Sequence, residues 1–395
     1  MRRYSQVVEE SIRAQTLVRD WMRAGLLDPS QRARLEAELR VDVKRTNVFL
    51  RAGLALFAAL IVGASVALVM NGFDPSGPTS LALATGLPAL ACIGLAELLV
   101  GRLRFYRFGV EEALAVAAVF LLSFSAAALV AERQYGLFRE ASWIAGLLVG
   151  AAGGFGIYRR FGFVYAAIGS MACAAAIPFQ MDVSAATKHA LAAAALAVVF
   201  LVARSKRLRY QDDYPGDEYG QLQAAALAGI YIVLNLQLRF DLFNRTPGIG
   251  TGAFYWFTYE MTWVLPIVGL RLGLREKDRA LMDVSLVMAL VTLVTNKPYL
   301  GWPRHTWDPI LLGVFLMAIA IALRRWLSNG PGGERRGFTP APLLGKDSAV
   351  LTVLRTASAA FQPDTLRPQG TRADPAQPSD FGGGRSGGGG GGGNY

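Results

Sequence analysis

The feature that most constrains the fold of this chain is a series of uninterrupted apolar blocks, each long enough for a membrane-spanning helix. AGLALFAALIVGASVALVM at 52–70 and ALAVAAVFLLSFSAAALVA at 113–131 are two of them. A helix needs about 20 apolar residues to cross the hydrocarbon core of a bilayer. Charged residues make up only 17% of the 395 residues, whereas soluble domains carry roughly 25%. We therefore expect an all-α integral membrane protein.

Ten such blocks predict ten membrane spans, which form a helix bundle over residues 47–325. The expected ranges are 47–70, 79–100, 111–131, 141–158, 162–180, 187–203, 221–238, 253–271, 279–296 and 307–325. Of the 40 Lys and Arg residues, 33 lie on the side that carries both termini. The positive-inside rule makes that side the cytoplasm. We expect a bacterial inner-membrane location, with the lipid bilayer as a partner.

The segments outside the spans predict two cytoplasmic ends. Residues 1–46 are expected to form a helical hairpin, in which Asp28 caps the second helix, Pro29 takes its first position and Gln31 completes a capping box. Residues 326–380 predict a linker with a short amphipathic helix near 346–361, and residues 381–395 a disordered, glycine-rich tail. A cytoplasmic protein partner is expected to bind through 1–46 or 335–395, and the oligomeric state stays open.

The stretch WMRAGLLDPSQRARLEAEL at 21–39 resembles the N-terminal module of a family of predicted bacterial membrane proteins of unknown function. In that family, a helix end of the form W-x(3)-G-(L/I) and a second short helix precede many spans. The resemblance covers about the first seventy residues. It implies a multi-span inner-membrane protein and no particular activity.

Standard catalytic signatures are missing, because the sequence contains no HExxH, Walker or CxxC motif. The sequence contains only two histidines, which are too few for a histidine-based metal site or an imidazole relay. We therefore expect no catalytic residue, no cofactor and no metal. The net charge of +11 follows from membrane orientation, and no nucleic-acid-binding signature accompanies it, so no nucleic acid is expected as a partner.

An acidic loop, QDDYPGDEYG at 211–220, directly follows the basic segment RSKRLR. Its carboxylates are Asp212, Asp213, Asp217 and Glu218. Mutual neutralisation of the two segments is the expected role. Binding of Ca²⁺ or Mg²⁺ through carboxylate oxygens is the alternative.

The stretch FYWFTYEMTWVLP at 254–266 places the carboxylate of Glu260 inside an apolar and aromatic span. An ionised acid near mid-bilayer costs about 3 kcal/mol on insertion scales, so Glu260 is expected to face the protein interior or a water-filled cavity. Glu260 is either a structurally paired charge or part of an outward-facing pocket in which it pairs with Lys297 until a ligand or proton separates them. The candidate residues of this polar site are Glu260, Lys297, Arg304, His305, Asp308 and Asn235.

Gly146, Gly150 and Gly154 share one face of the predicted span 141–158. Glycines at this spacing let another helix approach closely in a membrane, where packing has to hold the helices together. Ordinary helix packing is the expected role, and a dimer interface or a pore lining is the alternative.

The ten-span architecture and the buried acid favour a permease-like carrier of a small solute or a proton. The alternative is a membrane sensor, scaffold or assembly factor that acts through its cytoplasmic ends. A membrane enzyme that uses the outer polar residues on lipid-linked substrates is a third hypothesis. The missing nucleophile and metal ligands argue against an enzyme.

Overall fold

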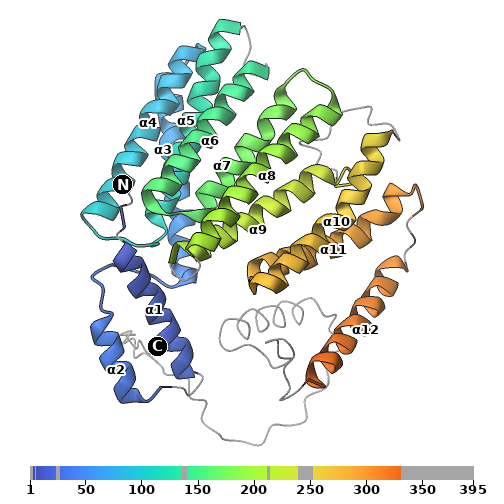
Figure 1. Ribbon diagram of the computed structural model, residues 1–395. Coiled ribbons are helices and arrows are strands. Elements are labelled where there is room, and N and C mark those ends of the chain that lie inside the picture. Colours follow the sequence, from blue (N-terminus) through green and yellow to red (C-terminus); the bar gives the residue numbers. More distant parts are fainter. Residues whose placement is uncertain are drawn as a thin grey trace, which may run out of the picture. The chain divides into compact units, whose positions relative to one another are not determined.

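The computed structural model describes residues 3–4, 6–23, 27–134, 140–210, 214–238, 252–303, 305 and 307–330. Within these ranges the regular structure is helical, apart from an isolated bridge between Lys44 and Phe105. The elements labelled in Figure 1, with the 3₁₀ helix η1, are α1 (Gln6–Arg23), α2 (Pro29–Glu38), α3 (Val48–Phe73), α4 (Pro78–Gly101), α5 (Val110–Gln134), α6 (Glu140–Phe161), α7 (Val164–Ala176), η1 (Ile177–Gln180), α8 (Ala185–Arg209), α9 (Tyr214–Leu234), α10 (Ala253–Glu276), α11 (Arg279–Tyr299) and α12 (Asp308–Ser328).

A helix lies at each of the ten places where the sequence predicts a membrane span. Among the described residues, seven helices are long and apolar enough to cross a membrane: α3, α4, α5 over Val110–Ala131, α6, α8, α11 and α12. The apolar segment Val164–Gln180, formed by α7 and η1, is shorter. α10 carries Glu260 among tyrosines and threonines, which lowers its mean hydropathy. The chain is therefore a multi-pass membrane protein, and the number of ten spans stays a prediction.

Polar groups at the helix starts accept hydrogen bonds from backbone N–H groups that have no partner within the helix. Asn47 precedes α3, and its side chain accepts a hydrogen bond from the Leu50 N–H at 2.7 Å. Before α2, the Gln31 side chain accepts a hydrogen bond from the Asp28 N–H at 3.0 Å, and Pro29 occupies the first position. The positions of Asp28, Pro29 and Gln31 at the start of α2 are as the sequence predicts, although the Asp28 side chain itself makes no capping hydrogen bond.

Helices that follow one another in the chain pack side by side from α4 to α9 (Figure 1). α3 packs against α4 and α5, while α10 and α11 pack against each other and against α9. The core between α4 and α5 contains Ala96, Ala115 and Ala118, which have no exposed surface. Small residues allow this close packing, which is needed because lipid supplies no hydrophobic drive between helices.

The three spaced glycines of α6 lie in close contact with the neighbouring helices α5 and α7. A Cβ atom at Gly146 would lie 3.0 Å from the Ser123 carbonyl oxygen of α5. A Cβ atom at Gly154 would lie 2.8 Å from the Ala166 carbonyl oxygen of α7, and Gly150 is buried between these two positions. This face of α6 is therefore occupied by contacts within the chain.

The N-terminal segment is attached to the membrane helices. Tyr4 is 7% exposed in a core with residues of α4, α5 and α6, and its hydroxyl donates to the Phe105 carbonyl oxygen at 2.8 Å. Burial raises the pKa of the Tyr4 phenol, which keeps the donated proton in place. The Lys44 N–H donates to the Arg104 carbonyl oxygen at 2.9 Å, and the Tyr106 N–H donates to the Lys44 carbonyl oxygen at 3.0 Å. In addition, α1 contacts α2 and α9.

α12 differs from the other long apolar helices in that none of its residues is buried. The side chains of Ile310, Val314 and Phe315 are 67%, 60% and 53% exposed. A helix that is apolar on all sides suits an environment of lipid. α12 therefore contributes no described residue to the cores that hold the other helices together.

Candidate functional site

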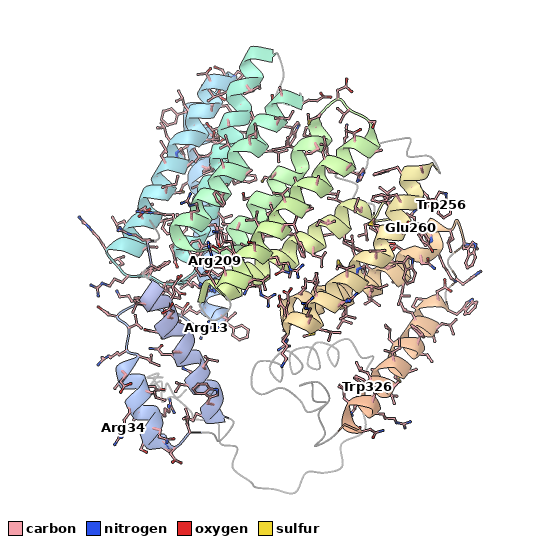
Figure 2. All side chains as sticks on the ribbon, in the orientation of Figure 1. Arg13, Arg34, Arg209, Trp256, Glu260 and Trp326 are labelled. Atoms are coloured by element: carbon pink, nitrogen blue, oxygen red, sulfur yellow. The ribbon has the colours of Figure 1, made fainter. Side chains whose placement is uncertain are left out.

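Glu260 lies on the exposed face of α10, one turn from the exposed Trp256 (Figure 2). Among the described residues, it has no hydrogen-bond or ion-pair partner. Glu260 therefore does not face the interior of the described helices, and its role as a site residue stays a prediction. The reason lies in helix packing, since a Cβ atom at Gly273 would lie 2.7 Å from Met282 Cγ of α11. The inward face of α10 accordingly consists of compact residues, namely Thr258, Thr262, Pro266, Gly269 and Gly273.

The predicted partner of Glu260 pairs with a different carboxylate. Lys297 Nζ lies 2.6 Å from Asp308 Oδ1, and Asp308 Oδ2 accepts a hydrogen bond from the His305 N–H at 2.9 Å. The predicted pair between Glu260 and Lys297 is thus not formed between these two described side chains. Instead, Lys297 connects the end of α11 to the start of α12. Arg304 lies outside the described residues.

Asn235 is 1% exposed at the end of α9 and takes part in a buried hydrogen-bond network. Its Nδ2 donates to the Tyr231 hydroxyl at 3.0 Å and to Thr295 Oγ1 at 3.2 Å. Its Oδ1 accepts from the Gln237 N–H at 3.2 Å. The Tyr231 hydroxyl also lies 2.8 Å from Thr292 Oγ1. Because a backbone N–H only donates, the bond to Gln237 fixes which end of the Asn235 amide carries the oxygen.

A second set of hydrogen bonds joins α10 to the same end of α11. The Tyr255 hydroxyl donates to the Tyr299 carbonyl oxygen at 2.8 Å, and the Tyr259 hydroxyl donates to Asn296 Oδ1 at 2.9 Å. The Tyr299 hydroxyl accepts from the Leu236 N–H at 2.6 Å. These groups satisfy one another, so they serve to join α9, α10 and α11.

A cavity of about 390 Å³ lies between α7, α8 and α9, beside η1. Small-molecule sites typically have volumes of about 300–1,000 Å³. Most of the lining is apolar and includes Met171, Phe179 and Leu196. The polar side chains of the described lining are His189 and Asn235. This arrangement, an apolar cavity with two polar groups, is typical of a site for a small and mainly apolar molecule.

His189 belongs to the cavity lining, is 4% exposed and has one ring nitrogen without a hydrogen-bond partner among the described residues. Its Nδ1 lies 2.6 Å from the Val233 carbonyl oxygen of α9. Because a carbonyl oxygen only accepts, Nδ1 carries the proton and Nε2 of the neutral ring is an acceptor. Nε2 is buried without a hydrogen-bond partner among the described residues. Leaving such an atom unpaired costs about 1–3 kcal/mol, so a ligand that donates to it would recover this cost.

Neither His189 nor its cavity is expected from the sequence, because two histidines are too few for a metal site or a relay. One signal was present in the sequence: an imidazole one turn inside an apolar span, after the helix-capping Ser184. A single neutral histidine can act as a hydrogen-bond acceptor without a metal and without a second histidine.

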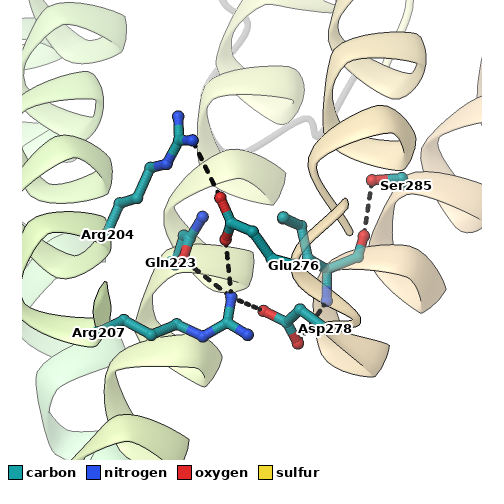
Figure 3. Close-up of polar contacts among 7 residues, drawn as sticks. Arg204, Arg207, Gln223, Glu276, Asp278 and Ser285 are labelled. Atoms are coloured by element: carbon teal, nitrogen blue, oxygen red, sulfur yellow. Dashed lines mark hydrogen bonds and ion pairs between the residues drawn. The ribbon is translucent and has the colours of Figure 1, made fainter. Parts of the chain in front are cut away.

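A buried ion cluster joins the end of α8 to the turn between α10 and α11 (Figure 3). Arg207 Nη1 lies 2.5 Å from Asp278 Oδ2 and 3.1 Å from Glu276 Oε2. Arg204 Nη2 lies 3.0 Å from Glu276 Oε1. Gln223 of α9 has no exposed surface and accepts a hydrogen bond from Arg207 at 3.4 Å. The side chains of Arg207 and Asp278 are 16% and 8% exposed, so water screens their attraction only weakly.

Asp278 also begins α11. Its Oδ1 accepts from the Leu281 N–H at 3.4 Å, and Ser285 Oγ donates to the Leu281 carbonyl oxygen at 2.6 Å (Figure 3). A carboxylate at this position interacts favourably with the positive end of the helix dipole. Asp278 therefore holds both the start of α11 and the end of α8.

The basic segment RSKRLR thus has partners that its sequence neighbourhood does not predict. Two of its arginines pair with the α10–α11 turn, about 70 residues further along the chain. The carboxylates of the acidic loop that were expected to neutralise them, Asp212, Asp213 and Asp217, lie outside the described side chains. Glu218 is 3% exposed.

Among the described residues, no group of three or more His, Cys, Asp or Glu side chains is arranged to hold a metal ion. The cavity beside His189 and the ion cluster around Arg207 are therefore the features from which a function can be inferred. Comparison of the chain with family models, with curated proteins and with solved structures finds no match.

Proposed function

We propose that the chain is a multi-pass membrane sensor whose ligand occupies the cavity between α7, α8 and α9 and acts on the N-terminal helices. The observation that carries this proposal is that α9 belongs to both regions. It lines the cavity with Gly229, Ile232 and Val233, and it contacts α1. At about 1.5 Å per residue, α9 covers about 22 Å between Tyr214 and Gly229. A ligand that shifts α9 would therefore act on α1 through a single helix.

The apolar lining favours a sensor over a carrier. A ligand that suits such a cavity also dissolves in the hydrocarbon core of the bilayer. A molecule of this kind crosses a membrane without a protein. A cavity that holds it therefore serves to detect or retain the molecule.

The charge distribution supports an orientation for this sensor. The excess of Lys and Arg on one side favours ten spans, with both termini in the cytoplasm of the bacterial inner membrane. In that orientation α1, α2 and the Arg207 cluster lie at the cytoplasmic face, and the cavity lies in the outer half of the membrane. Leu17 and Trp21 on α1 are 44% and 45% exposed, which supplies apolar surface for a cytoplasmic partner.

Hydrogen exchange on the protein in nanodiscs, with 1-naphthol as a small apolar probe, tests the sensor. We expect slower exchange in α7 to α9 and a changed rate in α1. Ala228→Phe places a larger side chain in the cavity lining and should remove both effects. Ala194→Phe, on the exposed side of α8, is the matched control and should retain both. Protection of α7 to α9 with no change in α1 would contradict the sensor.

A permease-like carrier of a small solute or a proton is the second candidate, and the ion cluster supports it. The pairs of Arg204 with Glu276 and of Arg207 with Asp278 hold one end of α8, α10 and α11 together. In a carrier, separation of these pairs would open that end. If the chain carries protons, we expect a protein-dependent proton flux into liposomes, measured with a trapped pH-sensitive dye. Ala228→Phe should lower this flux. The sensor predicts no such flux.

A further inference from the structure

We infer that the cavity takes a neutral alcohol or phenol with an apolar body, whose hydroxyl donates a hydrogen bond to His189 Nε2. This inference rests on the proposed function, since it names the ligand of the same cavity. It follows from the hydrogen-bonding capacity of the polar lining side chains that is not used by contacts within the chain.

Asn235 has no donor to offer a ligand. Its two amide hydrogens are used by the Tyr231 hydroxyl and by Thr295 Oγ1. Its oxygen accepts one hydrogen bond from the Gln237 N–H, and an amide oxygen has two lone pairs. The capacity that remains on Asn235 is therefore that of an acceptor.

His189 can also offer a ligand only a hydrogen-bond acceptor. The ring donates through Nδ1 to the Val233 carbonyl oxygen at 2.6 Å, which leaves Nε2 of the neutral ring as an acceptor. This Nε2 has no hydrogen-bond partner among the described residues. Both polar side chains of the described lining can thus only accept, so the ligand has to donate.

Charge narrows the class of ligand further. An ammonium group donates as well, but the described lining contains no Asp or Glu to neutralise it. Burial of an unpaired charge in an apolar site is strongly unfavourable. A carboxylate or phosphate ligand would bring acceptors to a lining that offers only acceptors, and a sugar would bring more polar groups than two side chains can pair. One neutral hydroxyl on an apolar body fits the lining.

The rest of the lining suits such a body. Met171 is flexible and adapts to the shape of a ligand, and Phe179 supplies an aromatic surface. The Phe179 ring stands at 89° to the His189 ring with centroids 5.0 Å apart, which holds the imidazole beside the apolar space. Aromatic and aliphatic bodies therefore both fit this lining. Because Nε2 is fully buried, the side chains around it must shift for a ligand hydroxyl to reach it.

The test compares 1-naphthol with 1-methylnaphthalene, which has a methyl group in place of the hydroxyl. Binding is measured on the protein in nanodiscs, and partition into empty nanodiscs is subtracted. We expect the wild type to bind 1-naphthol about tenfold more tightly, which corresponds to about 1.4 kcal/mol. His189→Phe should bind the two probes equally. His189→Gln, which again offers a side-chain oxygen as an acceptor, should restore part of the preference.

A second measurement leaves His189 in place. The chain has two histidines, so His305→Gln leaves His189 as the one imidazole to observe. In ¹⁵N spectra of labelled histidine, 1-naphthol should shift the acceptor Nε2 resonance, and 1-methylnaphthalene should not. An unshifted Nε2 resonance with 1-naphthol bound would overturn the inference, even if His189→Phe failed to fold.

The outcomes separate this inference from the proposed function. Equal wild-type affinity for both probes, lost in Ala228→Phe, would overturn the hydroxyl donor but leave the cavity as a binding site. If neither probe bound the wild type more tightly than Ala228→Phe, the cavity would not be a ligand site. The proposed function and this inference would then fail together.

Discussion

Arg207 and Asp278 lie 2.5 Å apart and connect the end of α8 to the first turn of α11. Both side chains are largely removed from water, and Arg207 also contacts Glu276 and Gln223. The pair therefore ties α8, which lines the cavity, to the turn between α10 and α11, two helices that pack against α9. Removal of the pair should therefore lower the stability of the packed helices α8 to α11.

We expect Arg207→Met to lower the free energy of unfolding by about 3–5 kcal/mol, because it leaves Asp278 as a buried charge without its partner, while Glu276 keeps its pair with Arg204. Unfolding in detergent measures this change. The control is Asp283→Asn, whose pair with Arg279 spans 3.5 Å with the Asp283 side chain 64% exposed. That variant should lose less than about 1 kcal/mol. Equal losses in the two variants would show that the Arg207 cluster is not effectively buried.

Substitution of a packed glycine should be costly where the same change two residues away is not. Gly154→Ala places a Cβ atom 2.8 Å from the Ala166 carbonyl oxygen, so α6 and α7 must separate. We expect a loss of about 1–3 kcal/mol in the free energy of unfolding. Gly156→Ala is the matched control on the same helix, since no atom lies within 4 Å of its Cβ position. A loss in Gly156→Ala as large as in Gly154→Ala would contradict the assigned packing.

Glu260→Gln should leave the protein at least as stable as the wild type. Glu260 has no partner among the described residues, so the substitution strands no opposite charge. An uncharged side chain on a lipid-facing helix surface is also cheaper than an ionised acid. Thermal unfolding at neutral and at mildly acid pH measures this. A Tm several degrees lower for Glu260→Gln would reveal a charge partner and would restore the paired structural role.

Tyr231→Phe should weaken the junction of α9 and α11. The Tyr231 hydroxyl is shared by Thr292 and Asn235, and its loss leaves both with one partner fewer. Hydrogen bonds between membrane helices are worth about 0.6–2 kcal/mol, so we expect a loss of about 1 kcal/mol. Tyr165→Phe, at a side chain that is 38% exposed, is the control and should change stability little. Equal Tm values for Tyr231→Phe and the wild type would argue against the network.

The helices are predictable because their signal is local. A long apolar block has to form its hydrogen bonds internally in lipid, and a helix lies at each of the ten predicted positions. The capping residues of α2 are local in the same sense, since Asp28, Pro29 and Gln31 lie within one turn. Length and pattern suffice for such elements.

The faces of the helices and their long-range partners are less predictable. Glu260 was expected to point inward because of its cost in lipid. However, Thr258, Thr262 and Gly269 already mark the opposite face of α10 as the packed one. The partner of Arg207 is distant in sequence, so no local pattern reveals it. The acceptor on His189 becomes visible only when the Val233 carbonyl oxygen assigns the ring proton.

The most direct test of the ligand cavity is the thermal stabilisation of the protein by 1-naphthol in nanodiscs. A ligand at about a hundredfold its Kd stabilises the folded state by about 2.7 kcal/mol. We predict that Tm rises for the wild type and for Ala194→Phe and stays constant for Ala228→Phe. A rise of the same size in all three proteins would mean that the probe acts through the lipid, and the ligand cavity between α7, α8 and α9 would be contradicted.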